Sequence, residues 1–199
     1  MVARLFLRET VDAMDLNNPN EIQFFRTLPT EARVEHLIDD GGLHEKDVLS
    51  LLKAAMGGDD TPLWPANQRW LLWQSDRLIA HGSVQRRWFV VKRHYYEGWH
   101  IGGVCVHPES QGKGISTLLM EQVHADLSPQ EFGFAVLNCG RHLIKFYERV
   151  GYSKVSERGM YIRDGALIID DDPALAISFK QAFDVGVLKC EAFPFAFDF

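Results

Sequence analysis

The fold of this chain is decided by the stretch Val104-Cys105-Val106-His107-Pro108-Glu109-Ser110-Gln111-Gly112-Lys113-Gly114-Ile115-Ser116. An apolar strand leads into a turn rich in glycine, and an amphipathic run follows with Ile115, Leu119 and Val123 at helical spacing. Gly112 and Gly114 let the main chain approach a ligand because they carry no Cβ. Backbone N–H groups then converge at the positive end of a helix, so the stretch predicts a diphosphate site.

Hydrophobic periodicity along the rest of the chain predicts a mixed α/β domain covering residues 1–199. Helices are expected at 21–26, 30–40, 44–56, from 112 or 115 to 127, and at 141–150, the first three forming a helical N-terminal segment. Strands are expected at 5–9, 69–74, 77–91, 99–106, 132–137, 152–157, 160–163 and 175–179, with a hairpin turn at 92–97. This order predicts a twisted, mostly antiparallel sheet flanked by helices, followed by an acidic, aromatic tail.

Composition excludes several classes of protein. The 199 residues are 46% hydrophobic and 24% charged, which is ordinary for a globular domain. A net charge of −6 argues against a nucleic-acid partner. The three cysteines have no metal-ligand or disulfide spacing, so no metal is expected, and their odd number fits a cytoplasmic location. No apolar run is long enough to cross a membrane, so no membrane partner is expected.

A second motif lies downstream, in the stretch Phe146-Tyr147-Glu148-Arg149-Val150-Gly151-Tyr152. Its Tyr stands on a predicted helix that ends at Gly before an aromatic residue. The upstream turn fits the pattern Gln/Arg-x-x-Gly-x-Gly/Ala through Gln111, Gly114 and Ser116, with Ser in place of the last Gly or Ala. Together the two motifs resemble the GCN5-related N-acetyltransferase (GNAT) superfamily, and the resemblance covers residues 69–179.

The resemblance implies that acetyl-CoA is the co-substrate and lies in a wedge between two splayed central strands. By position, the backbone of Val104, Cys105 and Val106 would pair with the pantetheine arm. The pyrophosphate would lie on the turn of Gln111, Gly112, Lys113, Gly114, Ile115 and Ser116. Splaying needs a break in strand pairing, for which Gly102-Gly103 and 138–140 are suitable. A plain bulge is the alternative at Gly102-Gly103.

The resemblance also assigns a general acid and leaves the base open. Tyr147 matches the tyrosine that protonates the leaving thiolate in many members, although a tyrosine here is also a natural core residue. Several relatives carry a glutamate base on the central strand, where this chain has Gly102. One alternative is His100 on the same strand face, because histidine side chains titrate in the right range. The others are Glu97 and deprotonation through water.

The stretch 78–87 and the run 170–172 resemble the aminoglycoside 2'-N-acetyltransferases, which act on polycations. This implies a small cationic amine as the acceptor, with the substrate contacts Gly102, Gly103, Asn138, Asp172 and Asp198. A solvated turn is the alternative for the aspartate run. The phenylalanines of the tail need a packing partner, which is either the same chain or a second subunit in a homodimer.

Two other functions remain open. The chain is alternatively a CoA-thioester-binding regulatory domain without turnover, which the loss of a strand glutamate at Gly102 would suit. A further alternative is the transfer of a longer acyl chain from an acyl-CoA or a carrier protein. Docking of a carrier protein would require a basic patch, for which the candidates are Arg86, Arg87, Lys92 and Arg93.

Overall fold

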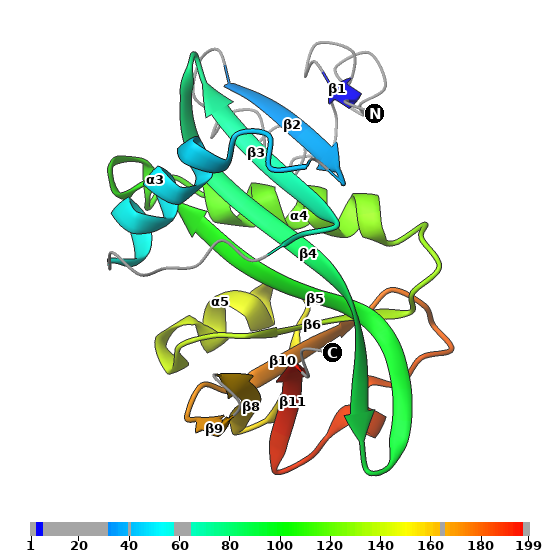
Figure 1. Cartoon of the computed structure of the whole chain (residues 1–199). Coiled ribbons are helices and arrows are strands. Elements are labelled where there is room, and N and C mark those ends of the chain that lie inside the picture. Colours follow the sequence, from blue (N-terminus) through cyan, green and yellow to red (C-terminus); the bar gives the residue numbers. More distant parts are fainter. Residues whose placement is uncertain (1–2, 6–31, 40, 58–64, 164–165, 197–199) are drawn as a thin grey trace. The chain divides into compact units, whose positions relative to one another are not determined.

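The computed structural model describes residues 3–5, 32–39, 41–57, 65–163 and 166–196 (Figure 1). It is a mixed α/β fold in which a large, mostly antiparallel sheet is flanked by helices, as the sequence predicts. The chain divides into two compact units. The first comprises Met1–Val84 and Gly103–Val123, and the second comprises Gln85–Gly102 and His124–Phe199. One domain over residues 1–199 stays a prediction.

In the first unit, neighbouring strands follow the order β1-β2-β3-β4-β5. Their bounds are Ala3–Leu5, Ala32–Ile38, Gln68–Gln74, Arg77–Val91 and His94–Val106, of which β4 and β5 continue into the second unit. The β1–β2, β2–β3 and β3–β4 pairs are antiparallel (Figure 1). Helices α3, Glu45–Met56, and α4, Ile115–Leu127, accompany these strands.

The helices of the first unit hold its sheet by their apolar faces. Helix α3 buries Val48, Leu51 and Leu52, which belong to one hydrophobic cluster with side chains of β2 to β5. Gly57 ends this helix with φ of 68°. Helix α4 approaches β4 closely, because a Cβ built on Gly82 would lie 3.5 Å from Leu119 Cδ2. This packing fixes the start of α4, where the glycine turn lies.

In the second unit, strands follow the order β5-β6-β10-β7, and a separate sheet has the order β11-β8-β9. The bounds are β6 Phe134–Asn138, β7 Ser153–Ser156, β8 Arg158–Arg163, β9 Ala166–Asp170, β10 Ala174–Ser178 and β11 Ala192–Ala196. The β5–β6 pair is parallel, while β10 is antiparallel to both β6 and β7. A 3-10 turn, Arg141–Leu143, leads into helix α5, Ile144–Arg149.

Aromatic side chains build the core of the second unit. Phe193 and Phe195 of the tail are buried in a cluster with Phe89 and Phe134. The ring centroids of Phe89 and Phe193 are 5.5 Å apart. These two tail residues therefore pack within their own unit. Phe197 and Phe199 lie outside the described residues, and the homodimer stays a prediction.

The helix predicted at 30–40 is wrong, because residues 32–38 form strand β2. The spacing of Val34, Leu37 and Ile38 suits a helix, but the buried residues are Glu35 and Leu37, which alternate as a strand requires. The buried Glu35 carboxylate accepts a hydrogen bond from Trp73 Nε1 at 3.1 Å and lies 3.4 Å from His44 Nε2. A buried acid whose partners lie far away in the sequence leaves no periodic signal.

The other differences are smaller. Strands β9 and β11 are absent from the sequence analysis, which treats 170–172 only as a turn and the tail as a segment without regular structure. The predicted turn at 92–97 contracts to Lys92 and Arg93, both with positive φ, so that β5 begins at His94. The predicted helix at 21–26 and residues 6–9 of the first predicted strand lie outside the described residues.

Candidate active site

The glycine turn before α4 presents backbone N–H groups at the surface of the first unit. Gly112 and Gly114 adopt φ of 74° and 77°, a left-handed conformation that glycine adopts without strain. A Cβ built on Gly112 would meet no atom within 4 Å, so this side of the turn is open. The N–H groups of Thr117 and Leu118 both bond to the carbonyl of Gly114, at 3.0 and 3.2 Å. The N–H groups before them start the helix and suit an anion.

Side chains of the same segment fasten the turn. Gln111 Nε2 donates to the carbonyl of Val106 at 3.1 Å, which ties the turn back to the end of β5. Lys113 Nζ donates to the carbonyl of Glu109 at 2.9 Å. Ile115, at 1% exposure, anchors the first helical turn in the core. Gln111 therefore shapes the predicted phosphate turn through its side chain.

The strand segment predicted to meet pantetheine lies at the end of β5 in the first unit. Cys105 and Val106 are buried, and Val104 is half-buried. Burial raises the pKa of the Cys105 thiol to about 12, so the thiol is protonated at neutral pH. Cys139 in the second unit is likewise protonated, because burial raises its pKa to about 11. Neither thiol is suited to be an acyl-accepting nucleophile.

Tyr147, the predicted general acid, lies on α5 in the second unit with 6% exposure. Its ring packs edge-on against Phe146 and Tyr152, with centroids 4.9 and 5.6 Å away. The chain turns back after the helix at Gly151, whose φ of 100° allows the Tyr152 N–H to reach the Tyr147 carbonyl at 3.0 Å. The second motif thus forms a compact helix end built around Tyr147.

A partly buried histidine supports this helix end. His124 Nε2 lies 3.0 Å from the Tyr152 hydroxyl, and burial lowers the pKa of His124 to about 4. Burial and the neighbouring Tyr147 raise the pKa of Tyr152 well above its ordinary value. The imidazole is therefore neutral and the phenol protonated at pH 7, and the two groups share one hydrogen bond.

We expect acid to destabilise the protein through His124. Its pKa is about 4 when folded and about 6.5 when unfolded, so the unfolded state binds more protons and stability falls as pH drops through that window. The loss is at most about 3.5 kcal/mol, because the shift is about 2.5 pKa units at about 1.4 kcal/mol each. Between pH 7 and pH 4.5 the Tm of His124→Gln should fall several degrees less than that of the wild type. An equal fall in both proteins would contradict the assignment, and the exposed His94→Gln is the matched control.

His100, the predicted base, lies on β5 in the second unit. Its Nε2 is buried and has no hydrogen-bond partner within the described part of the chain. The ring lies against Phe195 of β11, with centroids 5.1 Å apart. Burial, and then the charge of Arg87, lower the pKa of His100 to about 4, while Asn138 opposes the shift. His100 is thus neutral at pH 7, and its buried Nε2 has unused hydrogen-bonding capacity.

The predicted substrate contacts occupy different environments. In the second unit, a Cβ built on Gly102 would meet nothing within 4 Å, and Asn138 is exposed at the end of β6. In the first unit, a Cβ built on Gly103 would lie 3.0 Å from His81 Cε1, so this side of Gly103 is filled by protein. Asp198 lies outside the described residues. Gly102 and Asn138 are therefore the more accessible candidates.

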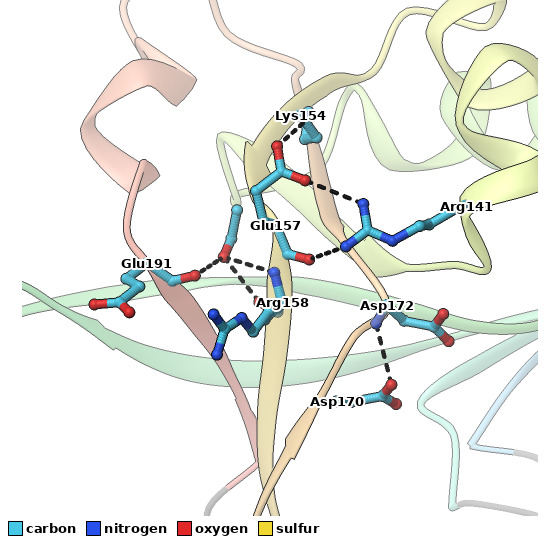
Figure 2. A network of polar contacts seen from close by, with 8 residues as sticks. Arg141, Lys154, Glu157, Arg158, Asp170, Asp172 and Glu191 are labelled. Carbon is cyan, nitrogen blue, oxygen red and sulfur yellow. Dashed lines mark hydrogen bonds and ion pairs between the residues drawn. The ribbon is translucent and has the colours of Figure 1, made fainter.

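The aspartate run is partly structural (Figure 2). Asp170 Oδ1 accepts the backbone N–H of Asp172 at 3.1 Å, which closes the turn between β9 and β10. Partial burial, and then the charge of Asp170, raise the pKa of the Asp172 carboxyl. Asp172 therefore gains from a cationic neighbour, whereas Asp170 is already used within the turn.

Neighbouring charges are paired with one another. Glu157 accepts hydrogen bonds from Lys154 and Arg141, and Arg141 also donates to the Glu157 carbonyl at 3.3 Å (Figure 2). Arg86, one of the four residues of the basic patch, forms ion pairs with Glu97 and Glu131. Arg86 is thus largely neutralised, which weakens this patch as a docking surface for an acidic carrier protein.

The candidates fall into two groups. The predicted acetyl-CoA contacts form one continuous segment of the first unit, residues 104–116. Tyr147, His100, Asn138 and Asp172 belong to the second unit. The position of Phe195 beside His100 was not predicted from the sequence, although the alternation of Phe193 and Phe195 is a strand signal. In the described residues, no cluster of three or more His, Cys, Asp or Glu side chains could hold a metal ion, and no helix is long and apolar enough to cross a membrane.

Comparison with solved structures identifies relatives of this fold. Escherichia coli YhbS, a GNAT family N-acetyltransferase in complex with CoA, matches with a TM-score of 0.59 and 11% identity over 85% of this chain and 92% of its own. Escherichia coli ElaA matches with a TM-score of 0.55 and 19% identity over 73% of this chain and 99% of its own. The ribosomal-protein-S18-alanine N-acetyltransferase of Escherichia coli matches with a TM-score of 0.54 and 15% identity, over 77% and 97%.

Some relatives are much longer. The chain covers 33% of a conserved protein from Enterococcus faecalis, which it matches with a TM-score of 0.53 and 21% identity over 63% of this chain. The search of curated proteins gave no match. At the level of sequence, residues 61–168 match the family model described as "Acetyltransferase (GNAT) domain", which is more than half of the chain. The chain therefore belongs to the GNAT acetyltransferase family.

Proposed function

We propose that this protein transfers the acetyl group of acetyl-CoA directly to a primary amine within a ternary complex. The observation that carries the proposal is the glycine turn at 111–116, where two exposed glycines with left-handed φ directly precede the start of α4. Such a turn fits the diphosphate of CoA. YhbS, which shares the fold, is a complex with CoA.

The end of β5 would bind the pantetheine arm through the backbone of Val104, Cys105 and Val106. Parallel pairing between β5 and β6 comprises Trp99 with Ala135 and His100 with Val136, and β5 continues to Val106. Backbone amides of an extended strand suit an extended amide-containing ligand, which adds to them as a further strand does. Lys113 and the N–H groups of Ile115 and Ser116 would complete the phosphate contacts.

Proton transfer would use two side chains of the second unit. The amine must be neutral to attack the thioester carbonyl, and His100, neutral at pH 7, would accept at Nε2 the proton that the nitrogen loses once the new carbon–nitrogen bond has formed. When the carbon–sulfur bond breaks, the Tyr147 phenol would protonate the departing thiolate and would later regain its proton from solvent. The acetyl carbonyl carbon is then bound to the amine nitrogen as an amide, and CoA leaves as a thiol.

The acceptor would be a small cationic amine of the aminoglycoside type. Asp172 is the carboxylate best suited to it, because a nearby cation would relieve the cost of ionising this partly buried acid. Open space beside Gly102 and the exposed amide of Asn138 would receive the rest of the molecule. Asp198 remains a candidate contact for this amine. We expect the enzyme to be cytoplasmic.

The test is CoA thiol release from acetyl-CoA in the presence of a panel of primary amines. We expect turnover that requires an amine, with intersecting initial-rate lines because both substrates are bound together. Binding of CoA without turnover of any amine would instead favour a regulatory domain. Faster turnover with longer acyl-CoA or with an acyl-carrier donor would contradict acetyl transfer. A panel of cationic and neutral amines, each measured at low and high salt, tests the acceptor class.

A further inference from the structure

Three neighbouring strands of the first unit are joined by buried polar side chains. Arg69 on β3 and His81 on β4 are 4% and 1% exposed. Arg69 Nη1 lies 3.3 Å from His81 Nε2. On the other side of the ring, His81 Nδ1 lies 2.7 Å from the carbonyl oxygen of Gly103 on β5. The imidazole therefore bridges a buried cation and a backbone carbonyl.

The two partners fix the tautomer of His81. A guanidinium only donates hydrogen bonds, so His81 Nε2 must accept from Arg69. The proton of the neutral ring is then on Nδ1, which donates to the Gly103 carbonyl. Arg69 thereby determines that His81 presents a donor to β5, and the ring is oriented from both sides.

Gly103 has a backbone conformation that matches this contact. Its φ is 61°, and a Cβ there would lie 3.0 Å from His81 Cε1 and 3.2 Å from its Nδ1. The Gly103 carbonyl is thus held by a side chain of β4 at an irregular point of β5. Four residues later, the N–H of His107 donates to the carbonyl of Ile79 at 2.8 Å. Val104–Val106 lies between these two attachments to β4.

We propose that His81, oriented by Arg69, is the positioning residue of the acyl-CoA site. By holding the Gly103 carbonyl, it sets the peptide planes that follow and aims the backbone groups of Val104–Val106 at the pantetheine arm. Preorganised backbone groups bind without reordering, and a displacement of about 1 Å can cost about 100-fold in rate. The inference rests on the proposed function, because it assumes that acetyl-CoA binds at this strand.

Two variants separate the contacts of His81. A glutamine amide reaches the position of Nε2 and accepts from Arg69, but it cannot donate to Gly103 from the position of Nδ1. An asparagine amide places its nitrogen near Nδ1 and keeps that donor. His81→Gln should therefore raise the Kd for CoA and the KM for acetyl-CoA about tenfold, with the KM of the amine within about twofold, since tenfold is the effect of one lost net hydrogen bond. His81→Asn should keep the Kd for CoA and the KM for acetyl-CoA within about threefold of the wild-type values.

Calorimetry with CoA and the Tm of each variant decide the outcome. If the wild type binds CoA, and His81→Gln and His81→Asn bind it with the same affinity as each other, the positioning role is wrong while the proposed function stands. If affinity simply follows Tm in both variants, His81 is only structural, which also overturns the inference. If CoA does not bind the wild type, the proposed function itself fails. Should His81→Gln not fold, Gly103→Ala disturbs the same contact from β5 and should weaken CoA binding likewise.

Discussion

Gly114→Val should weaken CoA binding at least about 100-fold. Valine cannot adopt the φ of 77° without strain, so the turn must change and its N–H groups lose their common direction. Loss of two charge-assisted hydrogen bonds, at about 1.5 kcal/mol each, sums to about 3 kcal/mol, which is about 100-fold in affinity. Titration calorimetry with CoA measures the effect directly.

Gly57→Val is the matched control. Gly57 has a φ of 68°, is exposed, and ends α3 in the same unit, so valine meets a similar backbone strain there. We expect both variants to lose a comparable amount of stability, while only Gly114→Val loses CoA. If a folded Gly114→Val protein binds CoA as the wild type does, the turn is not the diphosphate site and the proposed function loses its main support.

Local signals in the sequence were enough to predict the turn and its flanking elements. Gly112 and Gly114 stand between an apolar run and a helical period, and the predicted end of α4, Leu127, is the observed one. Strand β4 likewise has the predicted bounds, Arg77–Val91, because part of it alternates and polar residues mark the turns at its ends. Elements whose signal lies within their own residues were therefore predictable.

Elements that depend on distant partners could not be predicted from the sequence. Strand β2 buries Glu35, whose partner Trp73 lies on the next strand, and periodicity cannot show that pairing. Strand β11 runs parallel to β8, a long-range pairing that no local motif marks. The same limit applies to the candidate site. Tyr147 and the glycine turn belong to motifs, whereas the orientation of His81 by Arg69 becomes visible only when β3, β4 and β5 lie side by side.

Tyr147→Phe should lower kcat by about 100-fold to 10,000-fold, the usual contribution of general acid–base catalysis. The substitution keeps the buried ring and its packing against Phe146 and Tyr152, and removes only the hydroxyl proposed to protonate the CoA thiolate. The Kd for CoA should therefore stay within about threefold of the wild type, and Tm should change little. Steady-state rates of thiol release over pH 6–10, with calorimetry for CoA, test these expectations.

Tyr152→Phe, at a neighbouring phenol, should lower stability and leave catalysis nearly unchanged. Its hydroxyl lies 3.0 Å from His124 Nε2, so removing it leaves a partly buried nitrogen without this partner, which costs about 1–3 kcal/mol. For a chain of this size that corresponds to a fall in Tm of about 2–4 °C per kcal/mol. We expect Tyr152→Phe to lower Tm with kcat within about threefold, and Tyr147→Phe to lower kcat with Tm unchanged. If Tyr147→Phe instead loses Tm and keeps its kcat, Tyr147 is a core residue and another group, or water, protonates the thiolate.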